Sequence, residues 1–140
     1  MILLDTNVLS VFMKPETDAV AKSWLNAQPR ESLSTTAITV FEIRSGLEIL
    51  ALSRRRQSLE DAFELALTVA FAGRVVPFDE TAAQAAGRIA AARRKMGRPV
   101  EVRDLQIAGI AIAHKAKLAT RNIRHFEGLG VELIDPWQLN

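Results

Sequence analysis

The chain has 140 residues, no cysteine and only two histidines. Without cysteine it can form neither a disulfide nor a thiolate metal site, and His114 and His125 alone argue against a zinc site. Its longest apolar runs, such as residues 107–113, are too short to cross a bilayer, and the N-terminus lacks the basic start of a signal peptide. We therefore expect a cytoplasmic protein with no membrane attachment.

Several motifs of common enzyme classes are also missing. The sequence contains no GxxxxGK[ST] phosphate loop, no GxGxxG dinucleotide fingerprint and no GxSxG nucleophile elbow. The acid of "DTN" at residues 5–7 is not followed by the second acid of the DxD motif that phosphoaspartate phosphatases use. These absences argue against nucleotide-binding, serine-hydrolase and phosphoaspartate chemistry.

Hydrophobic residues make up 49% of the chain and charged residues 24%, as in ordinary globular proteins. We expect one domain over residues 1–140, since the length suits a single core. Apolar runs predict strands at residues 2–4, 32–34, 74–78, 118–120 and 132–134. Helices are predicted at residues 6–12, from Pro15, and at 37–52, 53–70, 79–95 and 104–115. This alternation indicates an α/β fold, with helices on both faces of a mainly parallel sheet of four to five strands.

Charge is distributed unevenly along the sequence. Residues 88–124 contain ten Lys and Arg against two acids, a net charge of +8, whereas the remainder carries a net charge of −6. Such an asymmetry favours an anionic partner. The alternative for the run Arg93, Arg94 and Lys95 is that it only solvates a helix end. Another basic run, at residues 54–56, is interpreted as a solvated turn.

One acid follows the first strand directly. Asp5 comes after Ile2-Leu3-Leu4, which reads as a strand buried on both faces. A carboxylate in that place must be capped, solvated or bound to a partner, because burying it alone is costly. In open parallel sheets, ligands bind beyond the carboxyl ends of the strands, which is where Asp5 is expected.

Two further acids lie on inward-facing helical positions. Glu42 shares a helix side with Ile38 and Gly46, and Asp104 precedes an apolar stripe that includes Ile107. The alternatives are a surface glutamate and a helix N-cap, respectively. Asp5, Glu42 and Asp104 together would suit a hard cation such as Mg²⁺, which prefers oxygen ligands. Two other acids have structural explanations, a helix cap for Asp79 and a turn for Asp135.

Five segments, in this order and spacing, resemble the PIN-domain ribonucleases, and among them the VapC-type toxins of bacterial toxin–antitoxin pairs, particularly the FitB-like subgroup. The segments are "MILLDTNVLS", "TTAITVFEIRSG", "RVVPFDE", "RDLQIAGIAIAH" and "LATRNIRHFEGLGVELIDPW". The resemblance covers essentially the whole chain and implies a PIN-like three-layer α/β/α sandwich.

The resemblance also implies a site. Asp5 and Asp104 match the Mg²⁺-binding aspartates, Glu42 matches the acid of the ExxxG helix, and Thr120 matches a positioning hydroxyl. Thr6, Asn7 and Asn122 are further supporting candidates. Asn122 and His125 stand where the family commonly has a fourth acid, so we expect one Mg²⁺ or Mn²⁺ to bind and a second ion to bind weakly or not at all. Arg93, Arg94, Lys95, Arg98 and Arg121 are candidates for binding the RNA backbone.

Our leading hypothesis is a toxin that hydrolyses RNA phosphodiester bonds with Mg²⁺ or Mn²⁺. The resemblance further implies a homodimer and a VapB-like antitoxin, with which the toxin can assemble on operator DNA. One alternative is a nucleic-acid-binding regulatory module with little or no catalysis, which would bind RNA in EDTA without cleaving it. Another is a Mg²⁺-dependent hydrolase of small phosphomonoesters, which would leave RNA intact.

Overall fold

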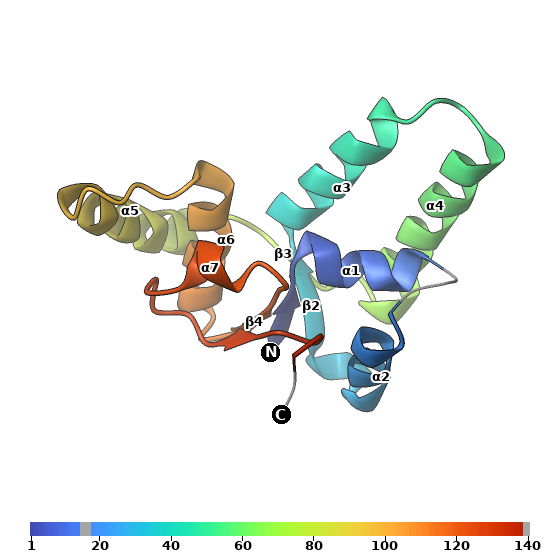
Figure 1. Cartoon of the computed structure of the whole chain (residues 1–140), viewed down its shortest axis with the longest axis horizontal. Helices are drawn as coiled ribbons and strands as arrows, with labels where there is room; N and C mark the ends of the chain where they lie inside the picture. Colours follow the sequence, from blue (N-terminus) through green and yellow to red (C-terminus); the bar gives the residue numbers. More distant parts are fainter. Residues whose placement is uncertain (15–17, 139–140) are drawn as a thin grey trace.

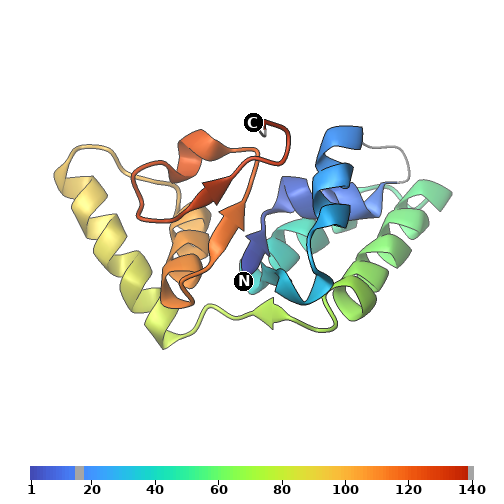
Figure 2. The ribbon, with the colours of Figure 1, turned by 90° about the horizontal axis from the view of Figure 1, so that it is seen from below.

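The computed structural model describes residues 1–14 and 18–138, and a parallel sheet of five strands lies at its centre (Figures 1 and 2). The strands are β1 (Ile2–Leu4), β2 (Leu33–Thr36), β3 (Val75–Val76), β4 (Lys117–Ala119) and β5 (Leu133–Ile134). Their order is β3-β2-β1-β4-β5, and every pairing is parallel. The predicted parallel sheet is confirmed, and β1 occupies its middle.

Seven α-helices surround this sheet in the described part of the chain. They are α1 (Thr6–Met13), α2 (Ala19–Ala27), α3 (Ala37–Ile49), α4 (Arg54–Leu65), α5 (Glu80–Lys95), α6 (Val102–Ala113) and α7 (Ile123–Phe126). A 3₁₀ turn (Arg30–Ser32) precedes β2, and α4 continues into a π-helical turn (Ala66–Ala70). The helix start predicted at Pro15 lies outside the described residues. No helix in the described ranges is long and apolar enough to cross a membrane.

Successive side chains of β1 enter two different cores. Leu4 belongs to a cluster with residues of α1 to α4, such as Val8 and Phe63, whereas Leu3 belongs to a cluster with residues of α6 and α7, such as Ile107 and Phe126. This alternation is the two-residue period of a strand with both faces covered. The molecule is therefore the expected three-layer α/β/α sandwich, and its two helical layers lie on either side of the sheet in Figure 2.

Helices α5 and α6 make the closest helix–helix contact of the fold. A Cβ atom added at Gly109 in α6 would lie 2.4 Å from the carbonyl oxygen of Ala82 and 2.8 Å from the Cβ of Ala86, both in α5. Only glycine leaves room for these backbones, and the small alanines of α5 allow the same approach from the other side.

The helix caps confirm one prediction and correct another. Asp79 caps α5 as expected, since its Oδ1 accepts a hydrogen bond from the Ala82 N–H at 3.0 Å. Asp104 is not an N-cap, because α6 begins at Val102 and its cap is Glu101. The Glu101 Oε2 accepts from the N–H groups of Arg103 and Asp104, at 3.1 and 3.4 Å. Asp104 lies in the first helical turn, where its side chain is free of the capping role.

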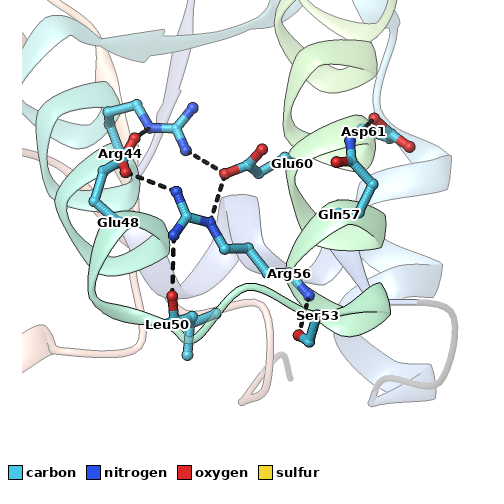
Figure 3. A network of polar contacts seen from close by, with 8 residues as sticks. All are labelled: Arg44, Glu48, Leu50, Ser53, Arg56, Gln57, Glu60 and Asp61. Carbon is cyan, nitrogen blue, oxygen red and sulfur yellow. Dashed lines mark hydrogen bonds and ion pairs between the residues drawn. The ribbon is translucent and has the colours of Figure 1, made fainter.

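Helices α3 and α4 form a hairpin that rises from the sheet (Figure 1) and is joined by a polar network (Figure 3). The Arg56 guanidinium donates to Glu60 at 2.8 Å, to Glu48 at 2.6 Å and to the Leu50 carbonyl at 3.0 Å, and Arg44 donates to the same Glu60 oxygen at 2.9 Å. The interpretation of residues 54–56 as a solvated turn is therefore wrong. They form the first turn of α4, directly after its N-cap Ser53, and Arg56 is held between the two helices.

Candidate functional site

Asp5 directly follows the central strand β1, and hydrogen bonds hold both its backbone and its side chain. Its N–H donates to the Ala119 carbonyl of β4 at 3.0 Å, and its Oδ1 caps α1 by accepting from the Thr6 N–H at 2.8 Å. Its Oδ2 accepts from the Thr120 hydroxyl at 2.7 Å. Asp5 is only 6% exposed, so a nearly buried carboxylate lies at the carboxyl edge of the sheet, where two hydrogen bonds hold its oxygens and a third holds its backbone.

The other two predicted acids line the same pocket. This pocket has a volume of about 230 Å³ and opens at the carboxyl ends of β1 and β4, between α3, α6 and α7. Its lining residues are Asp5, Thr6, Asn7, Glu42, Glu101, Asp104, Asn122 and His125. We call it the acidic pocket, because four of these eight side chains are carboxylic acids. Parallel topology explains the meeting, since strands that run the same way end at the same edge.

The surroundings of Asp5, Glu42 and Asp104 disfavour the ionised form of these three carboxyl groups. Burial raises the pKa of Asp5, although hydrogen bonds from Thr120 and Thr6 oppose the rise. Burial also raises the pKa of Glu42, and the negative charge of Asp5 raises it further. The pKa of Asp104 is raised for the same first reason, with Glu101 and Asp5 adding to the effect. Clustered acids of this kind favour a bound cation.

An arginine and a histidine lie against these acids. The Arg103 guanidinium is 3.8 Å from Glu42 and 3.9 Å from Glu101, and it lies 5.9 Å from the centre of the Phe41 ring. His125 Nδ1 is 3.2 Å from Asp104 Oδ2. His125 belongs to α7, which brings it over the edge of the sheet.

Arg103 and Glu101 were not predicted as site residues. Their signal in the sequence is the alternation of charge in "EVRD" at the start of the α6 helical pattern.

The predicted supporting residues surround Asp5. The Thr120 hydroxyl, which donates to Asp5, also accepts from the Asn122 N–H at 3.0 Å. The Asn7 side chain accepts from the Arg121 N–H at 3.0 Å and so ties α1 to the segment after β4. The Thr6 hydroxyl is buried and has no hydrogen-bond partner among the described residues. A buried hydroxyl of this kind, at the wall of a pocket, is available to bond to a ligand there.

The predicted RNA-binding arginines and lysine are divided between two places. Arg93, Arg94 and Lys95 form the last turn of α5, and Arg98 follows in the loop to α6; none of the four lines the acidic pocket. Arg121 lies nearer, directly after Thr120, and its guanidinium packs 4.7 Å from the centre of the Trp137 ring.

The donor set fits a hard divalent cation in its chemistry. All four acids of the pocket offer oxygen ligands, its only lining imidazole is His125, and burial raises the pKa of Asp5, Glu42 and Asp104. In the ranges that the structure describes, however, no three His, Asp or Glu side chains stand close enough to hold one ion directly. Mg²⁺ keeps several of its waters, so fewer direct protein ligands suffice.

Comparison with known proteins assigns this arrangement to a family. The family model described as "PIN domain" matches residues 2–130. The chain is 38% identical to the VapC ribonuclease Y4jK of Sinorhizobium fredii, with 99% of each chain covered, and 34% identical to toxin FitB of Neisseria gonorrhoeae, with 98% of this chain and 99% of that protein covered. It superposes on a structure of FitAB bound to a DNA fragment with a TM-score of 0.90 at 34% identity, covering 100% of this chain and 98% of that one.

Proposed function

Because this chain belongs to the PIN-domain family, and its relatives are VapC and FitB toxins, we propose that it is a divalent-metal-dependent endoribonuclease that works through the acidic pocket. The family assignment makes the chain a nuclease and the toxin component of a toxin–antitoxin pair. The metal dependence and the roles of individual residues are our proposal. They rest on the acids gathered at the carboxyl edge of the sheet.

Asp5, Glu42 and Asp104 would hold Mg²⁺ or Mn²⁺. The ion supplies a Lewis acid for the scissile phosphate and lowers the pKa of an attacking water. Asp5 is the most rigid of the three, since Thr120 and Thr6 fix both of its oxygens. Glu42 comes from the second turn of α3 and Asp104 from the first turn of α6, so each carboxylate can rotate toward Asp5 without moving a strand.

The single observation that carries this proposal is the placement of Asp5. The Asp5 side chain is 6% exposed and has a raised pKa. It lies in a pocket with two further carboxyl groups whose pKa values are also raised. Such an arrangement opposes folding unless a cation is bound, and titratable groups with shifted pKa values cluster at functional sites. A purely structural role for Asp5 as a helix cap would not need Glu42 and Asp104 beside it.

The partner of this toxin is an antitoxin. The similar structure is a FitAB assembly on DNA, and the same kind of complex on operator DNA is expected here. The acidic pocket gives an antitoxin a direct means of inhibition, since a basic side chain placed in it would pair with carboxylates that the ion needs.

One observation favours the alternative of a binding module with little catalysis. Asn122 and His125 line the acidic pocket where a fourth acid is common in the family, and the described side chains form no ready three-ligand cluster. In that case RNA would bind in EDTA and remain intact with any metal.

The test is cleavage of a mixture of tRNA and rRNA by the purified toxin, freed of antitoxin, with Mg²⁺ or Mn²⁺. We expect discrete fragments that disappear in EDTA and with Asp5→Asn. Arg55→Ala, an exposed substitution on α4, serves as the matched control and keeps full activity. Intact RNA under all conditions, with RNA bound in EDTA, would establish the binding module instead.

A further inference from the structure

A second, larger cavity adjoins the acidic pocket. It has a volume of about 500 Å³ and shares Asn122 and His125 with the acidic pocket. Its other lining residues include Arg121, Arg124, Glu127, Asp135 and Gln138. We call it the arginine cavity. Its volume is within the range of about 300–1,000 Å³ that is typical of small-molecule sites, which is enough for one nucleotide.

We propose that the arginine cavity is a subsite for the ribonucleotide next to the scissile phosphate. In this subsite Arg121 and Arg124 hold the backbone, while Asp135 and Gln138 select the base. The inference rests on the proposed ribonuclease function and deepens it, because it assigns a substrate position and a base preference to residues outside the acidic pocket.

Arg121 is held in place before any ligand binds. Its guanidinium packs on Trp137 at 4.7 Å and lies 3.8 Å from Asp18 Oδ2, and the Trp137 indole N–H donates to the same Asp18 oxygen at 2.6 Å. Its backbone N–H donates to the Asn7 side chain, which itself lines the acidic pocket. The position of this arginine is therefore coupled to the site where the phosphodiester would be cleaved. A preorganised arginine loses little side-chain entropy when it binds a phosphate.

Arg124 lies one turn further along, in α7, and is exposed. No ion pair joins it to an acid within the described residues. The acidic pocket would hold the scissile phosphate. Two arginines three residues apart beside it suit the neighbouring phosphate of an RNA chain. A small phosphomonoester would have no group to place against them.

Asp135 and Gln138 add acceptors and an amide to the lining of the arginine cavity. Asp135 Oδ1 accepts from the Trp137 N–H at 2.9 Å, and its other oxygen accepts no hydrogen bond from a described residue. A carboxylate accepts from amino groups on adenine, guanine and cytosine, whereas uracil presents one N–H between two carbonyl oxygens that repel it. The Gln138 amide can donate and accept beside it. We therefore expect a base that carries an amino group to be preferred over uracil.

The test uses fluorescent single-stranded RNAs that contain one cleavage site and differ only in the base beside it. Arg124→Ala is expected to raise KM by about five- to tenfold and to reduce the slope of affinity against salt by about one, with kcat changed less than about twofold. Asp135→Asn keeps the turn, because an asparagine oxygen can also accept from the Trp137 N–H. With this variant the preference for an amino-bearing base over uracil should fall by at least about fivefold. Arg55→Ala is the matched control and should change neither property.

A second measurement separates failure of the subsite from failure of the ribonuclease. Binding of the same RNAs is followed by fluorescence anisotropy in EDTA, where no cleavage is needed. Weaker binding by Arg124→Ala than by Arg55→Ala supports the subsite, even if the wild-type toxin cleaves none of these RNAs. Equal binding by the two variants overturns it, as does a loss of antitoxin affinity with unchanged RNA affinity, which would make the cavity an antitoxin surface.

Discussion

Thr120 is the residue on which the geometry of Asp5 depends most. Its hydroxyl is fully buried, donates to Asp5 and accepts from the Asn122 N–H, so one oxygen joins the ends of β1 and β4 to the start of α7. A buried hydroxyl with both roles filled positions its neighbours and also stabilises the fold. This residue thus links the stability of the sheet edge to the chemistry of the site.

Thr120→Ala should therefore reduce both stability and activity. Loss of the hydroxyl leaves a buried carboxylate with one hydrogen bond fewer, so we expect the free energy of unfolding to fall by about 1–3 kcal/mol. RNA cleavage should fall about tenfold or more, as for other residues that orient a metal ligand. Urea unfolding and initial cleavage rates measure the two effects. Thr120→Ser, which keeps the hydroxyl, should restore most of the activity, and an equally inactive serine variant would contradict this role.

Glu42, unlike Thr120, should support activity while lowering the stability of the metal-free protein. Its pKa is raised in the folded protein above the ordinary 4.5, so between these two values the folded chain binds more protons than the unfolded chain. The stability contributed by this group is therefore lost as pH rises through the folded pKa. Glu42→Gln removes the cost, and we expect its Tm without metal to exceed that of the wild type by a few degrees at neutral pH.

Thermal unfolding in EDTA at two pH values tests this expectation. Below about pH 4 the glutamate is protonated in both states, so the advantage of Glu42→Gln should vanish there. Loss of the 3.8 Å contact with Arg103 works against the gain, but partly exposed ion pairs contribute little. A glutamine variant less stable than the wild type at neutral pH would show that Glu42 is stabilised by its surroundings.

At the level of single residues the sequence predicted the acids better than their neighbours. Asp5 follows a buried strand and Glu42 and Asp104 lie on inward helical faces, and all three line one pocket. Glu101 and Arg103 were missed as site residues because their positions depend on where α6 begins. Helix starts are set by capping, and the N-cap of α6 is Glu101, whereas the sequence had suggested Asp104 as a possible N-cap.

At the level of elements, the α5–α6 contact is the most sensitive. Gly109→Ala would put a methyl group 2.4 Å from the Ala82 carbonyl oxygen, which forces the helices apart. We expect a loss of about 2 kcal/mol or more in the free energy of unfolding. Gly87→Ala in α5 is the matched control, because a Cβ there meets nothing within 4 Å, and it should stabilise the helix by about 0.5–1 kcal/mol. Equal effects of the two substitutions would refute this packing.

The α3–α4 hairpin depends on Arg56. This side chain is 14% exposed and bridges Glu48, Glu60 and the Leu50 carbonyl at the end of α3. Arg56→Ala would leave the Leu50 carbonyl without its donor and Glu48 and Glu60 with Arg44 as their remaining partner, so Tm should fall by several degrees. Arg55→Ala, on the neighbouring exposed position, should leave Tm unchanged in the same scans. If both variants melt together with the wild type, the network contributes nothing measurable.

The sequence predicted which elements form but not their ends. All five strands and six of the helices lie where periodicity placed them, although β3 is two residues long instead of five and the helix after Ser53 changes to a π-helical turn at Ala66. Strand ends depend on pairing with a neighbour, and Val75 and Val76 are the only residues of that segment in register with β2. The short helix α7 carries too little periodicity to be recognised.

At the level of the whole molecule, parallel topology turns scattered acids into one site. Asp5, Glu42 and Asp104 are far apart in the sequence and meet because β1, β2 and β4 end at one edge and α3 and α6 begin there. Two basic residues also lie at this edge, since Arg121 and Arg124 follow β4 and line the cavity beside the acidic pocket. The fold thus places an acidic centre for a cation next to a basic wall for a polyanion.

The most direct measurement of this account is Mn²⁺ binding, followed by electron paramagnetic resonance of the free ion. Wild-type toxin, purified without antitoxin, should deplete the free Mn²⁺ signal at a ratio of about one ion per chain, and excess Mg²⁺ should restore the signal. Asp5→Asn and Asp104→Asn should lose most of this binding, while Arg55→Ala keeps it. A wild-type protein that leaves the signal unchanged, or an Asp5→Asn variant that binds as tightly, would contradict a metal site in the acidic pocket.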